Sequence, residues 1–511
     1  MRSIIFAALF VLAPFSPSFG TAHAQTSAFS VRSLSKQIKD VQDSANPNPF
    51  QIGMLQSLRA IEGMLQTRYN FGLGASLRSL PLFRLPLPGP ANPRPEPFEG
   101  QVITDLMTDF LQGMSAAQTS LDAELPQNAR AFELTLQDIW FDIDQNGIRI
   151  EGEGALELLA PRLMSRRDLR EMKESGAFER PMTVRFDSAD HAWLTAYTHL
   201  LSGFASFVLA YDPAPVIDLL AAKRKSAFDT PTSPAEESPD LAELSENLRD
   251  ADNALRAAKE KRVLAEERYA DLEKQMFSIQ DKLTADDRTD EDIAEAMSDL
   301  RKYVTQAQFA KTRMDEAGKE EERRTFDATD ARKAFERELT KRPVMPKDQF
   351  GNFLDPIYIA LTALAQEPAN ENITAAMTHW KSMIRQNRLF WRLLAIETDN
   401  KREWIPNPNQ RSVFGIRISE DMANAWQDVL DDADALIEGE KLVPHPLFPE
   451  SYGISLSAFA KNPGPIDTIE SIHGIGSYEY AVQGERVSNA NWRVFRRMTA
   501  GNQIGFAIFL N

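Results

Sequence analysis

The chain of 511 residues contains no cysteine. Disulfides, thiolate zinc sites and cysteine nucleophiles are therefore excluded together. A chain of this length can bury enough apolar surface to hold its fold without disulfides, even outside the cytoplasm. The length predicts two or three folding units.

The sequence also lacks the strong catalytic motifs. It has no His-Glu-x-x-His, no Gly-x-x-x-x-Gly-Lys phosphate loop and no Gly-x-Ser-x-Gly elbow. Basic residues are outnumbered, with 57 lysines and arginines against 74 acidic residues and a net charge of -17. Nucleic acid and anionic lipid surfaces repel such a chain, so we expect no nucleic-acid partner.

The first residues predict an export signal at 1–24. Arg2 supplies a positive start, residues 4–13 form an apolar run, and Ala22 and Ala24 offer small side chains to a signal peptidase. We expect cleavage before Gln25 and a periplasmic or secreted protein with no stable membrane anchor. The alternative is an uncleaved N-terminal anchor.

A second apolar segment, 192–211, offers another membrane interpretation, because it is long and Lys223 follows it on a basic flank. It nevertheless contains Thr195, His199 and Ser202 among several polar side chains. We therefore interpret it as a core helix of a soluble body, opened by Asp187 as its N-cap.

The sequence predicts a mainly α fold with a few short strands. Two helices split by an Asn-Pro-Asn-Pro segment start the body, and the alternation from Phe132 predicts a strand that pairs with 182–186. Residues 25–225 and 347–511 are predicted to be the two halves of one globular body.

Residues 226–346 are predicted to be a linker followed by a coiled-coil hairpin. Leucine and alanine recur at alternating steps of three and four over 241–283, and a second such pattern covers 293–339. A polar turn at 284–290 separates the two, so we expect an antiparallel hairpin. The alternative is a parallel dimer of one long helix.

One segment, 142–153, has the spacing of a calcium loop. Calcium takes six to eight oxygens, and an EF-hand loop supplies carboxylates at positions 1, 3 and 12, an oxygen at 5 and glycine at 6. The expected ligands are Asp142, Asp144, Asn146, the Ile148 carbonyl and Glu153. The resemblance to the EF-hand covers these twelve residues only, and a strand rather than a helix is expected before them. The alternative is an ordinary Asx-rich turn.

Two further groups of residues can be interpreted chemically. Asp187, Asp190 and His191 open a helix, where they form either a polar site or a capped first turn. A proline-stiffened loop after a long helix offers polar groups for a ligand or partner, unless Trp404 simply pins it to the core. The candidate residues of this loop are Arg402, Glu403, Trp404 and Asn407.

Four motifs together are similar to those of an uncharacterised family of exported bacterial proteins. They are Asp142-x-Asp-x-Asn-Gly, Phe186-Asp-x-x-Asp-x-x-Trp-Leu-x-x-Tyr-x-His199-Leu-Leu, Thr398-Asp-x-x-Arg-Glu-Trp-x-Pro-Asn-Pro-x-Gln410 and the final Gly505–Asn511. The resemblance implies no activity and no catalytic residues. It implies that the coiled segment is an insertion into one body.

These observations lead to one functional expectation and one alternative. We expect a periplasmic interaction or scaffold protein, with Ca²⁺ as a structural ion and a protein partner docked on the coiled-coil arm. The alternative is an envelope hydrolase that uses paired carboxylates as acid and base.

Overall fold

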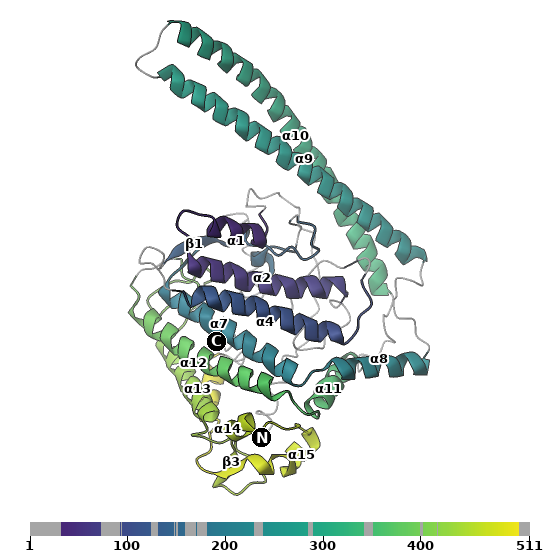
Figure 1. The fold of residues 1–511 in the computed structure, drawn as a ribbon, viewed down its shortest axis with the longest axis vertical. Coiled ribbons are helices and arrows are strands. Elements are labelled where there is room, and N and C mark those ends of the chain that lie inside the picture. Colours follow the sequence, from purple (N-terminus) through teal and green to yellow (C-terminus); the bar gives the residue numbers. More distant parts are fainter. Residues whose placement is uncertain are drawn as a thin grey trace. The chain divides into compact units, whose positions relative to one another are not determined.

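The computed structural model divides the chain into two compact units, which are described separately below (Figure 1). The body comprises residues 1–90, 96–230 and 348–511, and the arm comprises 91–95 and 231–347. The structure describes residues 32–72, 92, 95–123, 131–147, 149, 152–158, 170, 181–228, 239–284, 290–341, 351–398, 402–415 and 417–499. The predicted signal peptide at 1–24 and the final motif at 505–511 lie outside these residues.

The prediction of a mainly α fold is confirmed. The described helices of the body are α1 (Leu34–Gln42), α2 (Pro49–Asn70), α4 (Gln101–Leu121), α7 (Ser188–Ala210), α8 (Ala214–Phe228), α11 (Gly351–Leu364), α12 (Asn370–Ile396), α13 (Glu420–Glu438), α14 (Leu456–Lys461), α15 (Thr468–His473) and α16 (Ala490–Met498), with 3-10 turns η3 (Leu136–Asp138) and η5 (Ile475–Tyr480). α2 begins as its sequence predicts, because Asn48 accepts hydrogen bonds from Phe50 and Gln51 and Pro49 stands at the first helical position.

The long helices α2, α4, α7 and α12 lie side by side in the body (Figure 1). α7 packs against both α4 and α12, and two of its hydroxyls bond within the helix: Thr195 donates to the His191 carbonyl and Thr198 to the Thr195 carbonyl. Among the described residues, α7 is the one helix long and apolar enough to cross a membrane, and 61% of its most apolar window is buried. This burial is the pattern of a core helix.

The largest apolar core of the body joins segments far apart in the sequence. Phe50 from α2, Trp193 from α7, Phe390 from α12, Trp426 from α13 and Phe495 from α16 all belong to it. The two halves on either side of the arm therefore share one core.

Two small antiparallel sheets complete the described body. β1 (Phe132–Thr135) pairs with β2 (Thr183–Phe186), with Phe132 opposite Phe186, as the alternation predicts. β3 (Tyr452–Ile454) pairs with β4 (Ala481–Gln483) near the C-terminal end of the described chain. β2 leads directly into α7 through Asp187, so this sheet fixes the position where the central helix starts.

The arm consists of α9 (Pro239–Thr284) and α10 (Asp290–Lys341). The two helices are antiparallel, since Leu248 near the start of α9 packs on Phe335 near the end of α10, while Leu272 packs on Ala307. Arg262 also pairs with Glu321 at 3.1 Å across the helices. Within one chain, the two helices thus lie against each other as a hairpin.

One boundary differs from the sequence prediction. The linker was expected to begin at 226, but α8 continues to Phe228 and had not been predicted as a helix. Its apolar residues, Val216 and Ile217 among them, pack against α4 in a second core. Asp212 and Pro213 form the turn that starts α8, and Asp212 accepts a hydrogen bond from the Ala214 N–H.

Candidate functional site

The predicted calcium loop brings its three carboxylates together. One carboxylate oxygen from each of Asp142, Asp144 and Glu153 lies within 4.8 Å of the other two. Asp142 and Asp144 are half-buried, and Glu153 is fully buried. Ile148, whose carbonyl was predicted as a ligand, lies outside the described residues. The spacing that suggested calcium therefore produces a compact group of oxygen atoms.

The backbone of the loop turns where the motif requires it. Gly147 has a φ of +74°, and its N–H donates to both Asp142 carboxylate oxygens at 3.0 and 3.1 Å. Asn146 donates through its backbone and its side chain to Asp144. These bonds belong to an Asx turn as well as to a calcium loop, so the turn by itself does not separate the two interpretations.

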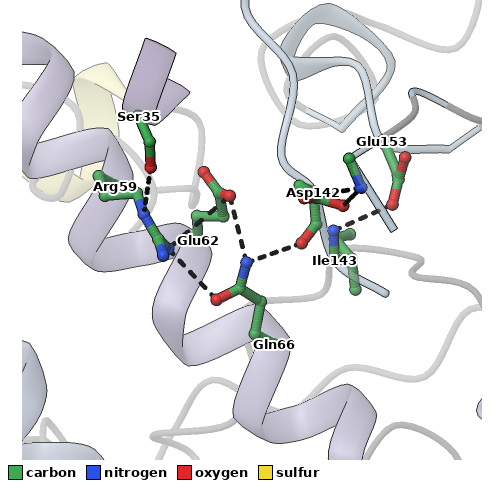
Figure 2. A network of polar contacts seen from close by, with 8 residues as sticks. Ser35, Arg59, Glu62, Gln66, Asp142, Ile143 and Glu153 are labelled. Carbon is green, nitrogen blue, oxygen red and sulfur yellow. Dashed lines mark hydrogen bonds and ion pairs between the residues drawn. The ribbon is translucent and has the colours of Figure 1, made fainter. Parts of the chain in front are cut away.

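Two interactions tie the loop to its surroundings (Figure 2). Glu153 accepts a hydrogen bond from the Ile143 N–H at 3.0 Å, and Gln66 on α2 donates to the Asp142 carbonyl at 2.8 Å. Burial, opposed by nearby Arg59, raises the pKa of the neighbouring Glu62 to about 7. The surroundings are not those of an EF-hand, because η3 precedes the loop and an antiparallel bridge between Trp140 and Gly154 closes it.

A second group of carboxylates, which the sequence does not reveal, lies where β2, α7 and α12 meet the 402–415 loop. Carboxylate oxygens of Asp187, Glu397 and Glu403 lie within 4.8 Å of one another. We call these three residues the carboxylate cluster. Asp187 caps α7 by accepting the Ala189 N–H, and Glu397 follows the end of α12. The cluster therefore joins residues that are up to 216 positions apart (187 to 403).

The surroundings of the carboxylate cluster are strongly negative. Burial, together with the Asp187 charge, raises the pKa of Glu397 to about 8 and that of Glu403 to about 7. Asp190, almost fully buried behind the cluster, accepts the Asp187 N–H at 3.1 Å. Burial, together with the Asp187 charge, raises its pKa well above the ordinary value. Arg185, 3.3 Å from Asp187, supplies positive charge.

His191 does not join Asp187 and Asp190 in a site. Its Nε2 lies 2.9 Å from the Leu121 carbonyl, and its ring packs edge-on against Phe50. Burial lowers its pKa. Asp187 and Asp190 form a capping box, so two of the three predicted residues have a structural role in addition to any chemical one.

The four residues of the predicted loop separate into two kinds. One guanidinium nitrogen of Arg402 donates to both carboxylate oxygens of Glu133. Trp404 packs among Phe186, Trp193 and Phe414, and Asn407 donates to the carbonyls of Leu394 and Glu397. These three hold the loop on the body. Glu403 alone turns its carboxylate into the carboxylate cluster.

The structure also pairs two histidines that sequence spacing leaves apart. The Nδ1 atoms of His199 on α7 and His379 on α12 lie 2.9 Å from each other. Burial and the neighbouring His379 lower the pKa of His199 to about 4, and burial lowers that of His379. Positions 199 and 379 fall on the facing sides of two packed helices, which only the helix pairing reveals.

Comparison with known proteins adds no assignment to this geometry. No family model, no curated protein and no solved structure matches the chain. The function has to be inferred from the described residues themselves. Of these groups, the convergence of carboxylates in the 142–153 loop could be predicted from the spacing of its residues. The sequence also singled out Glu403, in a proline-stiffened loop, but not its position beside Asp187 and Glu397.

Proposed function

We propose that the protein is an exported interaction protein whose arm docks a partner and whose body is stabilised by calcium. The observation that carries the proposal is a set of phenylalanines that the arm does not bury. Phe277 on α9 is 65% exposed, and Phe309 and Phe326 on α10 are 71% and 66% exposed. Leaving such side chains in water forgoes about 1.5–3 kcal/mol of burial energy each.

These phenylalanines are not needed for the contact between α9 and α10. That contact is already made by buried residues such as Leu248, Leu272 and Phe335, and by ion pairs. The exposed aromatic side chains are therefore available to another surface. Because they project from long straight helices, the occupant that fits them is a helix of a partner protein, packed at about 8–10 Å between axes.

Site-specific photo-crosslinking in the cell envelope tests the docking function. A photoreactive phenylalanine analogue at Phe309 should yield a discrete crosslinked product with a helical partner protein. The matched control places the analogue at Lys311, an exposed position on the opposite side of α10 from Phe309. Docking through the aromatic side chains predicts a much weaker product there. Equal products at both positions, products that contain only a second copy of this chain, or no product at either position would contradict the proposal.

The proposed calcium site rests on the geometry of the 142–153 loop. Three carboxylates converge, the glycine sits at the sharp turn, and buried Glu153 closes the loop from its twelfth position. The ion would be held by Asp142, Asp144, Asn146 and Glu153. A cation there offsets the mutual repulsion of the carboxylates and links the loop to α2 through Gln66.

Thermal unfolding tests this site. Asp144→Ala removes a carboxylate without disturbing the bond from Gly147 to Asp142, so it should lower the Tm in excess calcium and have much less effect in chelator. At a calcium concentration of about 100 Kd, binding contributes about 2.7 kcal/mol to the unfolding free energy. The control Asp40→Ala alters a surface carboxylate that pairs with Arg32. Equal losses of Tm in calcium and in chelator for Asp144→Ala would count against calcium.

The hydrolase alternative has one specific support, the close approach of Asp187, Glu397 and Glu403. Retaining glycosidases place two carboxylates at about 5 Å. Glu403, however, is only 3% exposed, so a sugar chain has little access to it. Hydrolysis of envelope glycan by the purified protein, abolished by Glu397→Gln, is the result that this alternative requires. The membrane alternative requires the processed protein to resist extraction with carbonate.

A further inference from the structure

We propose that the carboxylate cluster of Asp187, Glu397 and Glu403 binds one divalent cation that prefers oxygen ligands. This site is separate from the 142–153 loop and shares no ligand with it. It goes beyond the proposed function, because the arm and the calcium loop neither require it nor explain it.

Three carboxylates from different segments converge in the carboxylate cluster. Asp187 comes from the junction of β2 and α7, Glu397 from the end of α12, and Glu403 from the following loop. Bonds hold the three segments in place: Asp187 accepts the Ala189 N–H, Gln410 donates to Glu397 at 3.1 Å, and the backbone carbonyl of Glu403 accepts the Val413 N–H. A preformed group of three oxygens within 4.8 Å is what a small cation needs.

The second argument comes from Glu403. Glu403 is only 3% exposed, yet within the described part of the chain its carboxylate accepts no hydrogen bond and forms no ion pair, although the charge of Arg185 opposes the burial that raises its pKa. Its carboxylate oxygen instead faces those of Asp187 and Glu397. A buried charged group without a partner is costly, and such groups in native proteins are paired or bound to metals. A cation between the three oxygens supplies the missing partner.

Neighbouring charge and chemistry narrow the identity of the ligand. Asp190 adds a fourth carboxylate next to Asp187, and Arg185 pairs with Asp187 at 3.3 Å and opposes the burial that raises the pKa of Glu403. The one nearby histidine on α7, His191, binds the Leu121 carbonyl instead. An oxygen-only set favours Ca²⁺, Mg²⁺ or Mn²⁺ over zinc or copper, and the burial admits an ion more readily than an organic substrate.

Manganese is the probe, because bound and free Mn²⁺ are distinguished by electron paramagnetic resonance. We expect Glu403→Gln to lose one equivalent of tightly bound Mn²⁺ per chain relative to the parent protein. The control Glu133→Gln changes a surface carboxylate that pairs with the adjacent Arg402, and should bind as much Mn²⁺ as the parent. Circular dichroism of each full-length mature variant establishes that it is folded.

The outcomes separate this site from the calcium loop. If both sites exist, Asp144→Ala loses one equivalent, Glu403→Gln loses one, and the double variant loses both. If the loop binds nothing, Glu403→Gln still loses its equivalent, so the present inference survives the failure of the other. A parent protein that binds no Mn²⁺, or uptake unchanged by Glu403→Gln, would overturn it.

A second measurement covers the case in which the cluster holds protons instead of an ion. In chelator, Glu403→Gln should raise the Tm, because an uncompensated buried carboxylate is removed. In excess Mn²⁺ it should lower the Tm relative to the parent, because the ion's contribution is lost. If Glu403→Gln raises the Tm equally in chelator and in excess Mn²⁺, the carboxylates share protons and bind no cation.

Discussion

At the scale of single residues, two glycines on long helices differ in whether the structure has room for a side chain. A Cβ on Gly203 of α7 would overlap the indole ring of Trp380 on α12, whereas a Cβ on Gly63 of α2 would meet nothing within 4 Å. The first glycine permits the packing of two helices, and the second only weakens its own helix. The same substitution should therefore have opposite effects at the two positions.

We predict that Gly203→Ala destabilises the body by about 1–3 kcal/mol, since overpacking forces the indole or the helices to move. Gly63→Ala should stabilise it by about 0.5–1 kcal/mol, because alanine loses less backbone entropy on folding. Urea denaturation of the two variants beside the parent measures both values. A stabilising Gly203→Ala would mean that α7 and α12 do not approach as closely as this structure has them.

Local features were predictable at this scale and non-local ones were not. The Asp142 loop and the capping role of Asp187 follow from spacing within a few residues, because the chain itself places those atoms together. The role of Glu403 depends on Glu397 and Asp187 being brought to it by the ends of α12 and β2. No pattern within the 402–410 loop contains that information.

At the scale of elements, the predictions succeeded where a periodic pattern was long. The repeated three- and four-residue steps predicted the helices that the structure shows as α9 and α10. Short elements such as β4 and α15 were missed, because three to six residues carry too little periodicity to distinguish them from turns. The sequence also did not predict which helices pack together.

The pairing of α7 with α12 has a consequence for pH dependence through His199. The His199 ring faces His379 on α12 and Gln118 on α4, with Asp122 and Arg385 also close enough to affect its charge. Folding lowers its pKa from 6.5 to about 4, so the unfolded chain binds this proton more readily than the folded chain. Stability is therefore complete above pH 6.5 and decreases as the pH falls towards 4.

We predict that between pH 7.5 and pH 5 the parent protein loses more Tm than His199→Asn, by at least about 2 °C. Asparagine can place a polar atom near the position of the histidine Nδ1, but it does not take up a proton. The exposed His473 provides the control, and His473→Asn should follow the parent at every pH. Parallel curves for the parent and His199→Asn would show that the histidine pair does not sense pH.

At the scale of the whole molecule, the body and the arm have separate apolar cores. Among the described residues, the four clusters of the body contain none from the arm, and the arm's clusters, around Leu248 and Leu272, contain none from the body. The arm follows α8 and precedes α11 in the chain, yet the core of the body joins residues from both sides of it. This organisation is consistent with an inserted arm, as the sequence resemblance implies.

Deletion of residues 236–341, with a short Gly-Ser linker in their place, should therefore leave a folded body. Each of the body's clusters keeps all its members, so we expect a cooperative thermal transition within about 5 °C of the parent, since no core contact is removed. Its Tm should still respond to calcium, because the 142–153 loop and Gln66 remain. The truncated protein should lose the partner that crosslinks through Phe309. If the folded truncation still binds the same partner from the envelope, the docking surface lies on the body and not on the arm. A truncation that fails to fold would show that the two units depend on each other for stability.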